Sequence, residues 1–213
     1  MQIKLSDTSY PLAKPLPVEI TYDNPAGQVL VVDNPVKSLF VEMHLVDLRT
    51  KEDHSYTMGK VVTTTFRGDQ DRYALVKPVP EALSIAPGSA FVFTSDPNER
   101  LYLRPGKFDC FLTDAAGESN HLELTIELTR ESVVTLFAIA REPKQGYSRR
   151  EWAMDWLQKI HSEFHLELAL PDDPPQKAAH GEADNAVVYA GFAAWWSQHE
   201  HGADMDERLK RVK

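Results

Sequence analysis

The sequence predicts a mainly β protein, in which an antiparallel β-sandwich is followed by a C-terminal helical appendage of two to three helices. Up to residue 128, short runs of alternating apolar and polar residues are separated by Asn, Asp, Pro and Gly, as in strands joined by tight turns. After residue 128 the spacing of apolar residues changes to that of amphipathic helices, and all four tryptophans lie there. We therefore expect a sandwich domain over residues 1–128, a helical appendage packed on it over 129–202 and a flexible tail over 203–213.

The clearest strand pattern covers residues 121–128, where every even position is apolar and every odd position is polar. A period of two places one face of a strand on a buried core. The same alternation over residues 39–45 predicts a strand in the middle of a sheet. Runs of β-branched and aromatic residues bounded by turn residues predict further strands at residues 18–22, 28–32, 60–66, 73–76, 90–94 and 101–103.

Three segments of the C-terminal part have helical spacing: residues 131–141, 151–164 and 184–199. The second has the most regular apolar stripe, formed by Trp152, Trp156, Ile160 and Phe164. Thr129 is placed to cap the first helix. Ser148 and Glu151 have the spacing of a capping box, in which the two side chains bind free backbone N–H groups at the start of a helix.

Residues 105–119 resemble the late strand and hairpin of the immunoglobulin-like superfamily. In that superfamily an aromatic residue stands two positions before a strand cysteine, and an Asp-x-x-Gly turn leads to the last strand. Here Phe108 occupies the aromatic position and Cys110 the cysteine position, and Asp114 begins the turn. The resemblance implies an immunoglobulin-like β-sandwich and implies no particular activity.

The chain carries 23 Lys and Arg residues against 32 Asp and Glu residues, a formal net charge of −9. Recognition of a nucleic acid needs a basic surface that displaces counterions, and the one basic stretch of the sequence is the short segment 208–213. We therefore expect no nucleic-acid partner. No apolar run approaches the ~20 residues that cross a bilayer, so we expect no membrane partner either.

The first residues become polar at once and lack the apolar stretch of a secretory signal. The single cysteine, Cys110, has no second cysteine with which to form an internal disulfide, which fits a reducing compartment. Both observations predict a cytoplasmic protein. Cys110 also lies between Phe108 and Phe111 without a basic neighbour, which favours a core position over a nucleophilic role.

Four histidines form the candidate metal site of the sequence. His161 and His165 are four positions apart, which on a helix places two imidazoles on one face about one turn apart. His199 and His201 stand at the end of the next predicted helix and would complete a set of ligands for a divalent metal if the two helix ends meet. The alternative is that all four are ordinary surface histidines and that the protein holds no cofactor.

Trp195 and Trp196 are the candidate partner contacts. Because adjacent positions on a helix point in different directions, the two side chains cannot both face the same core. One of them is therefore the best candidate for an exposed contact, since an aromatic ring offers a large rigid area. The alternative is that the tryptophans only join the appendage to the sandwich.

No segment matches a nucleotide-binding loop or the elbow of a serine hydrolase. A sandwich without a catalytic motif favours a non-enzymatic module that binds a ligand, a protein partner or a second copy of itself. Two alternatives stay open. One is a metal-binding protein or metal-dependent enzyme that uses the four histidines, and the other is a carbohydrate-binding protein that uses exposed tryptophan.

Overall fold

The structure is a computed structural model, and it describes residues 1–34, 41–58, 63–64, 74–75, 82–99, 101–115, 117–142, 145–164 and 182–212. The chain divides into two compact units. The first, which we call the β unit, comprises Met1–Thr8, Pro15–Leu101 and Gly106–Thr125. The second, the helical unit, comprises Ser9–Lys14, Tyr102–Pro105 and Ile126–Lys213. The chain passes from the β unit to the helical unit between Thr125 and Ile126, and two short earlier segments, Ser9–Lys14 and Tyr102–Pro105, also belong to the helical unit.

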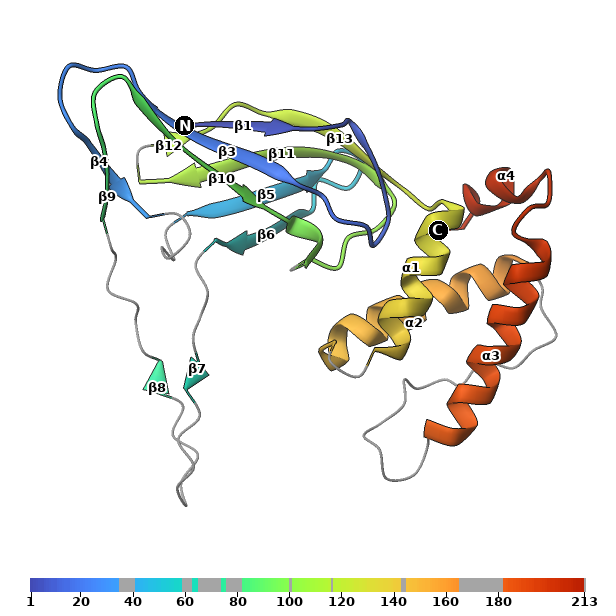
Figure 1. Ribbon diagram of the computed structural model, residues 1–213. Coiled ribbons are helices and arrows are strands. Elements are labelled where there is room, and N and C mark those ends of the chain that lie inside the picture. Colours follow the sequence, from blue (N-terminus) through green and yellow to red (C-terminus); the bar gives the residue numbers. More distant parts are fainter. Residues whose placement is uncertain are drawn as a thin grey trace. The chain divides into compact units, whose positions relative to one another are not determined.

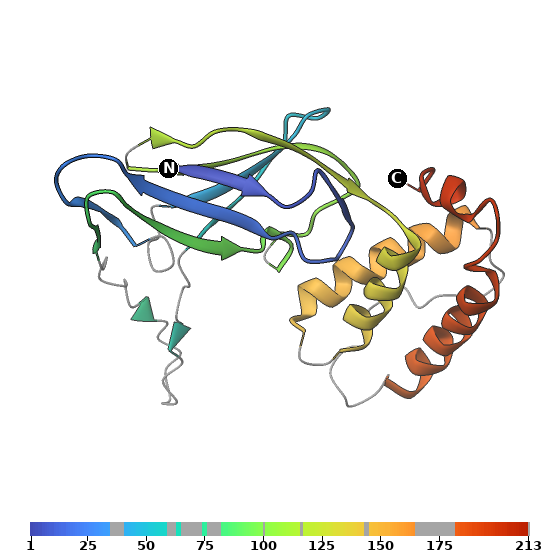
Figure 2. The same ribbon diagram turned by 45° about the horizontal axis from the view of Figure 1, so that its top comes forward.

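Two sheets make up most of the strand structure. The smaller has the order β1-β3-β10, and Figures 1 and 2 show β3 between its two antiparallel neighbours. The larger has the order β2-β13-β11-β5-β6, and β12 pairs with β11. Their bounds are β1 Gln2–Leu5, β2 Ser9–Pro11, β3 Val18–Asn24, β5 Glu42–Asp47, β6 Asp53–Thr57, β10 Ser89–Ser95, β11 Gly106–Asp114, β12 Gly117–Glu118 and β13 Leu122–Glu127.

The inner faces of these two sheets together form the core of the β unit. Side chains alternate between the two faces of β3, β5 and β11, so that every second side chain is buried. The fully buried side chains of these strands include Val18, Ile20, Met43, Leu45, Phe108 and Leu112. Hydrogen bonds join the sheets at two places. The Tyr22 hydroxyl donates to Asp114 Oδ2 at 3.2 Å, and the Tyr56 and Ser95 hydroxyls are 2.8 Å apart.

Cys110 lies in this core, as predicted. The residue is fully buried, and its thiol lies 3.6 Å from the Met43 sulfur on the neighbouring strand. Burial, with the nearby Asp109 carboxylate as the smaller cause, raises the pKa of Cys110 to about 12. A thiol with so high a pKa stays protonated at neutral pH and is not a nucleophile.

Two short antiparallel pairs lie outside these sheets: β4 Leu30–Asp33 with β9 Ala82–Ile85, and β7 Thr63–Thr64 with β8 Ala74–Leu75. The predicted strands 60–66 and 73–76 lie outside the described residues apart from β7 and β8. The prediction of a strand at residues 101–103 is wrong, because these residues have no strand pairing. One of them instead accepts a hydrogen bond from a helix. The Trp152 indole N–H donates to the Leu103 carbonyl at 3.1 Å.

The helical unit contains α1 Arg130–Arg141, α2 Tyr147–Glu163, α3 Glu182–His199 and α4 Met205–Leu209. Thr129 caps α1 as predicted, with its hydroxyl accepting from the Ser132 backbone N–H at 3.2 Å. The capping box predicted at Ser148 is wrong, because α2 begins earlier, at Tyr147, and its cap residue Gly146 has no side chain to bond. None of the described helices is long and apolar enough to cross a membrane.

The C-terminal residues form part of the packed helical unit. Residues 203–213 were expected to be a flexible tail, and instead they contain α4, whose Met205 and Leu209 are buried together with Val212. Arg130 of α1 donates to both carboxylate oxygens of Asp206, at 2.9 and 3.0 Å. The apolar residues of this short helix are four positions apart and fall on one face. Residues 205–212, which the sequence assigns to a flexible tail, thus carry buried side chains and an ion pair to α1.

Candidate functional site

The structure places the four candidate metal ligands in different surroundings. His161 on α2 is half-buried and meets the Phe192 ring edge-on. His199 at the end of α3 has its Nδ1 2.7 Å from the Trp195 carbonyl, and the His201 side chain is 85% exposed. His165 lies outside the described residues. No three His, Cys, Asp or Glu side chains among the residues that the structure describes are grouped so as to hold a metal ion.

The two adjacent tryptophans point in different directions, as their spacing predicts. Trp196 is 3% exposed and lies in the core of the helical unit, whereas Trp195 is half-exposed. The His199 ring is stacked on Trp195 with the ring centroids 4.8 Å apart, and Phe164 contacts Trp195 edge-on at 5.5 Å. One face of Trp195 is therefore already covered, and Trp195 is the member of the pair that remains accessible.

An open depression of about 610 Å³ lies in the helical unit. It is lined by α2 and the C-terminal residues, namely Asp155, Gln158, Lys159, Ser162, Glu163, Arg211 and Val212. The Lys159 ammonium already lies 4.2 Å above the Trp156 ring. Acidic and basic side chains are mixed along this depression, so that it selects no charged ligand of either sign.

Among the described residues, a cluster of histidine, aromatic and acidic side chains lies on the outer face of the larger sheet, within the β unit. Phe111 of β11 is directly opposite His44 of β5 in the antiparallel register, and the two rings are parallel within 7° with centroids 4.8 Å apart. On its other side Phe111 is stacked against His121, with centroids 4.4 Å apart. We call His44, Phe111 and His121 the ring row.

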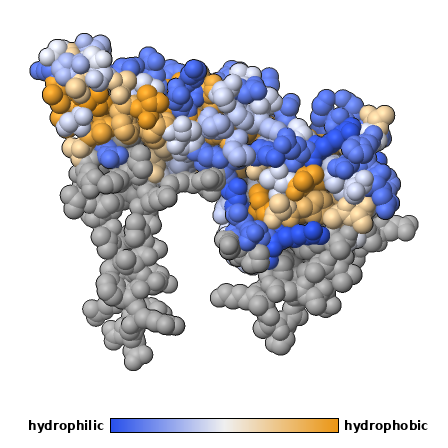
Figure 3. All heavy atoms as spheres, viewed as in Figure 1, coloured by the Kyte–Doolittle hydropathy of each residue, from blue (hydrophilic) through white to orange (hydrophobic). Residues whose placement is uncertain are grey.

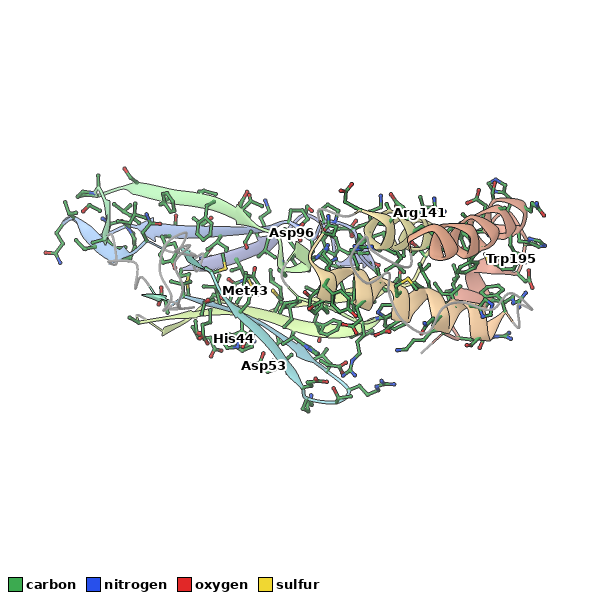
Figure 4. All side chains as sticks on the ribbon, turned by 90° about the horizontal axis from the view of Figure 1, so that it is seen from below. Met43, His44, Asp53, Asp96, Arg141 and Trp195 are labelled. Carbon is green, nitrogen blue, oxygen red and sulfur yellow. The ribbon has the colours of Figure 1, made fainter. Side chains whose placement is uncertain are left out.

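Strand alternation is the reason that the ring row faces outward. Met43 and His44 are consecutive on β5 and project to opposite faces, with Met43 in the core and His44 on the outer side near Asp53 of β6 (Figure 4). On β11, Phe108 and Cys110 point inward, so Phe111 has the outward position. An aromatic side chain in the outward position of a half-buried strand is unusual, because that face otherwise meets water.

His44 is held between an acidic and a hydroxyl side chain. Its Nδ1 is 2.8 Å from Asp53 Oδ2, and its Nε2 is 3.0 Å from Thr113 Oγ1. If Nδ1–H donates to the carboxylate, Nε2 can accept the Thr113 hydroxyl proton. This order of groups activates hydroxyl nucleophiles in hydrolases when donors for an oxyanion accompany it. Here Asp53, His44 and Thr113 lie on three neighbouring strands of one sheet, and their hydrogen bonds connect these strands on its outer face.

His121 is held between two carboxylates. Its Nδ1 is 2.8 Å from Asp109 Oδ2, and its Nε2 forms a short hydrogen bond with Glu118 Oε1. Because ionised carboxylates only accept hydrogen bonds, both ring nitrogens must carry a proton for both bonds to form. The hydrogen bond that His121 donates to Glu118, followed by the one that it donates to Asp109, accordingly raises the pKa of His121. The charged ring then lies against the Phe111 ring, in a geometry that favours a cation on an aromatic face.

Sequence reasoning missed the ring row, although part of its signal was present. Phe111 follows the buried positions Phe108 and Cys110 at odd spacing, which marks it as outward-facing. The pairing of His44 with Phe111 had no such signal, since it depends on which strands become neighbours and in which register. The spacing of the four candidate histidines drew attention to the helices instead.

Comparison with known proteins identifies no family for the chain. No family model matches it, and no curated protein matches it. Among solved structures, a DNA glycosylase AlkC of Pseudomonas fluorescens aligns at 10% identity and a TM-score of 0.36, covering 59% of this chain and 30% of its own. A β-glucosidase of Listeria innocua aligns at 15% identity and a TM-score of 0.35. The β-glucosidase EmGH1 of Erythrobacter marinus aligns at 13% identity and a TM-score of 0.34. Both alignments cover 59% of this chain, but only 16% of the Listeria enzyme and 15% of the Erythrobacter enzyme. At these TM-scores none of them assigns a fold family or an activity to this chain.

Proposed function

We propose that the protein is a non-enzymatic interaction module, and that the outer face of the larger sheet is the surface that meets its partner. The observation that carries this proposal is the ring row, in which rings from β5, from β11 and from His121 just before β13 lie side by side on an outer sheet face. Aromatic side chains are enriched in protein interfaces because they offer large contact area with little loss of conformational entropy.

The proposal includes an immunoglobulin-like sandwich as the scaffold, and the strand order supports it. An immunoglobulin-like domain has strands A, B and E in one sheet and strands G, F and C in the other, with a C′ strand added in some members. The orders β1-β3-β10 and β13-β11-β5-β6 correspond to A-B-E and G-F-C-C′. In this correspondence Phe108 and Cys110 lie on strand F, where the sequence resemblance places them.

Polar groups surround the ring row as they surround the centre of a protein interface. Four carboxylates border it, at Glu42, Asp53, Asp109 and Glu118, and their side chains are between 28% and 52% exposed. An apolar centre with a polar, partly hydrated rim is the common anatomy of transient interfaces. The hydrogen bonds of His44 to Asp53 and Thr113 hold its ring in a fixed orientation beside Phe111, which lowers the entropy lost on binding.

Site-specific photo-crosslinking tests this function. Ser55 is exposed and directly opposite His44 in the register of β5 and β6, so a photoreactive amino acid at this position reports on the ring row. Glu19, exposed on β3 of the other sheet, is the matched control position. In extracts of cells that make the protein, we expect a defined adduct from position 55 and none from position 19.

A competition step makes the result specific. Unlabelled wild-type protein should suppress the adduct at position 55, and protein with Phe111→Ala should suppress it much less. Equal adducts from both sheets, or equal competition by the Phe111→Ala protein, would contradict the proposal. An adduct whose mass is twice that of the chain would identify a second copy as the partner.

The expected cellular setting follows from the thiol and the charge. A fully buried, unpaired Cys110 suits a reducing compartment such as the cytoplasm. The formal charge of −9 favours a partner that is not a nucleic acid.

A further inference from the structure

The surroundings of His121 define the kind of group that the outer face recognises. Resting on the proposed function, we propose that the partner presents an arginine side chain to this face. The arginine replaces His121 on the Phe111 ring and between the carboxylates of Asp109 and Glu118, so that loss of the proton from His121 opens the site. His121 is thus an internal competitor that occupies the place of the partner's cation.

The chemistry of the site matches a guanidinium group. The site already holds a flat, delocalised cation that stacks on an aromatic ring and donates hydrogen bonds to carboxylates on two sides. A guanidinium group is also flat and delocalised, stacks on aromatic faces, and has five N–H donors arranged to meet carboxylates in pairs. A lysine ammonium carries the same charge but is compact, strongly hydrated and unable to stack. Arginine is therefore the side chain that reproduces every contact of His121.

Exposure favours replacement. The His121 side chain is 45% exposed and that of Glu118 is 52% exposed, so the imidazole can leave its place without opening the core. Glu118 follows Gly117, whose φ of +129° marks the turn between β11 and β12. In contrast, the His44 side chain on the other side of the ring is only 14% exposed and stays bound to Asp53. The ring row therefore has one fixed end and one end that can exchange.

The charges facing His121 set the direction of its pH dependence. Asp109 of β11 and Glu118 of β12 are bonded directly to it, and across the aromatic ring stand His44 of β5 and its partner Asp53 of β6. All of the carboxylates favour a cation at this place. When His121 loses its proton, it loses its charge and one of its two hydrogen bonds to carboxylates. An incoming guanidinium then meets weaker competition.

Linkage turns this competition into a measurable change of affinity. If only the form with neutral His121 accepts the arginine, the apparent Kd equals the intrinsic Kd divided by the fraction of protein in that form. Below the pKa of His121 that fraction falls about tenfold for each pH unit. The affinity for an arginine peptide should therefore rise with pH up to the pKa of His121 and then become constant.

The test is an NMR titration of the full chain with isotope-labelled histidine and phenylalanine. The probes are a short glycine-serine peptide that carries arginine and the same peptide with lysine. We expect the arginine peptide to shift the Phe111 ring signals and to bind several-fold more tightly than the lysine peptide. One pH unit below the measured pKa of His121, the arginine peptide should bind about fivefold to tenfold more weakly than one unit above it.

Three variants separate the site from general charge attraction. Asp109→Asn with Glu118→Gln removes the two carboxylates of the site, and Glu19→Gln with Asp23→Asn removes two exposed carboxylates from the other sheet. The variant at positions 109 and 118 should bind the arginine and lysine peptides equally, and the variant at positions 19 and 23 should still bind the arginine peptide more tightly. His121→Ala removes the internal competitor, so its affinity should stay high and nearly constant across the same pH range.

Two outcomes would overturn the inference, and the crosslinking experiment then shows whether the proposed function fails with it. An affinity unchanged across the titration of His121, or equal binding by both double variants, would contradict the arginine site. If the photo-crosslink at position 55 persists in that case, the interaction module stands and its partner uses other chemistry. If both experiments fail, the outer face of this sheet is not the interaction surface.

Discussion

Phe111 and His44 face each other across two neighbouring strands with their rings parallel within 7° and their centroids 4.8 Å apart. The pair stands on the side of the sheet that points away from the core, so its contribution to folding is modest. His121 extends it to a row of three rings whose polar atoms are all bonded to neighbouring side chains. An outer surface with three adjacent rings is suited to binding, and the experiments below separate the role of the ring row from that of the core.

Two phenylalanines on the same strand should differ in their importance for stability. Phe108 is fully buried, and Phe108→Ala should lower the free energy of unfolding by about 3–5 kcal/mol through loss of buried area and creation of a cavity. Phe111 is half-buried on the outer face, and Phe111→Ala should cost about 1–2 kcal/mol. Urea denaturation of both variants measures the difference. Equal losses would mean that the outer face is part of the core.

The pKa of His121 should lie above its ordinary value, and its stabilising effect should depend on pH. Because the pKa is raised in the folded state, the stabilisation is complete below the ordinary pKa of about 6.5 and is lost as the pH rises through the raised value. The loss of stability in His121→Ala should therefore be larger at about pH 5.5 than at about pH 9. Urea denaturation at the two pH values, with NMR titration of the ring, checks both statements.

A matched histidine variant serves as the control for that experiment. His201 has an 85% exposed side chain and lies 3.8 Å from a single carboxylate, Glu200. His201→Ala should have little effect on stability, as is usual for an exposed surface side chain. If His121→Ala behaves like His201→Ala, the two carboxylates around His121 do not hold its proton.

The Cys110 thiol should be unreactive in the folded protein. It is fully buried, and burial raises its pKa to about 12, so neither access nor ionisation favours attack on a thiol reagent. We expect no measurable labelling by a disulfide reagent in native buffer and rapid labelling of one thiol in concentrated guanidinium. Labelling in native buffer would indicate frequent opening of the sheet around β11.

The C-terminal helix should contribute to stability rather than fray. Leu209 is fully buried, and Leu209→Ala should cost about 2–4 kcal/mol. Its neighbour Lys210 is exposed and pairs with Glu207 on the surface, so Lys210→Ala should have little effect. Thermal unfolding followed by tryptophan fluorescence measures both variants. Equal and small effects would favour the flexible tail that the sequence predicted.

Several elements could be predicted because their cause is local. The alternation over residues 121–128 corresponds to β13, and the four-residue stripe that begins at Trp152 corresponds to the buried face of α2. Thr129 caps α1 because a hydroxyl at that position can reach the next free N–H groups whatever the rest of the chain does. The box at Ser148 failed because α2 starts earlier, at a residue that the local pattern does not mark.

The candidate site was harder to predict because its contacts join distant parts of the chain. His44 and Thr113 are hydrogen-bonded although 69 residues separate them. His121 finds Asp109 only because the β11–β12 hairpin brings positions twelve residues apart together. The spacing of the candidate metal ligands was a local signal, and among the described residues His161, His199 and His201 belong to no group of three metal-binding side chains.

The sequence by itself determined the three longer helices and several of the strands, such as β3, β5 and β13, together with the side of those strands that faces the core, because both follow from the spacing of apolar residues along a few turns or pleats. Only the tertiary structure decided that His44, Phe111 and His121 form one row. A shift of one residue in the register of β5 and β11 would have put His44 opposite a core position. That register is set by the packing of the whole sheet, and the ring row depends on it.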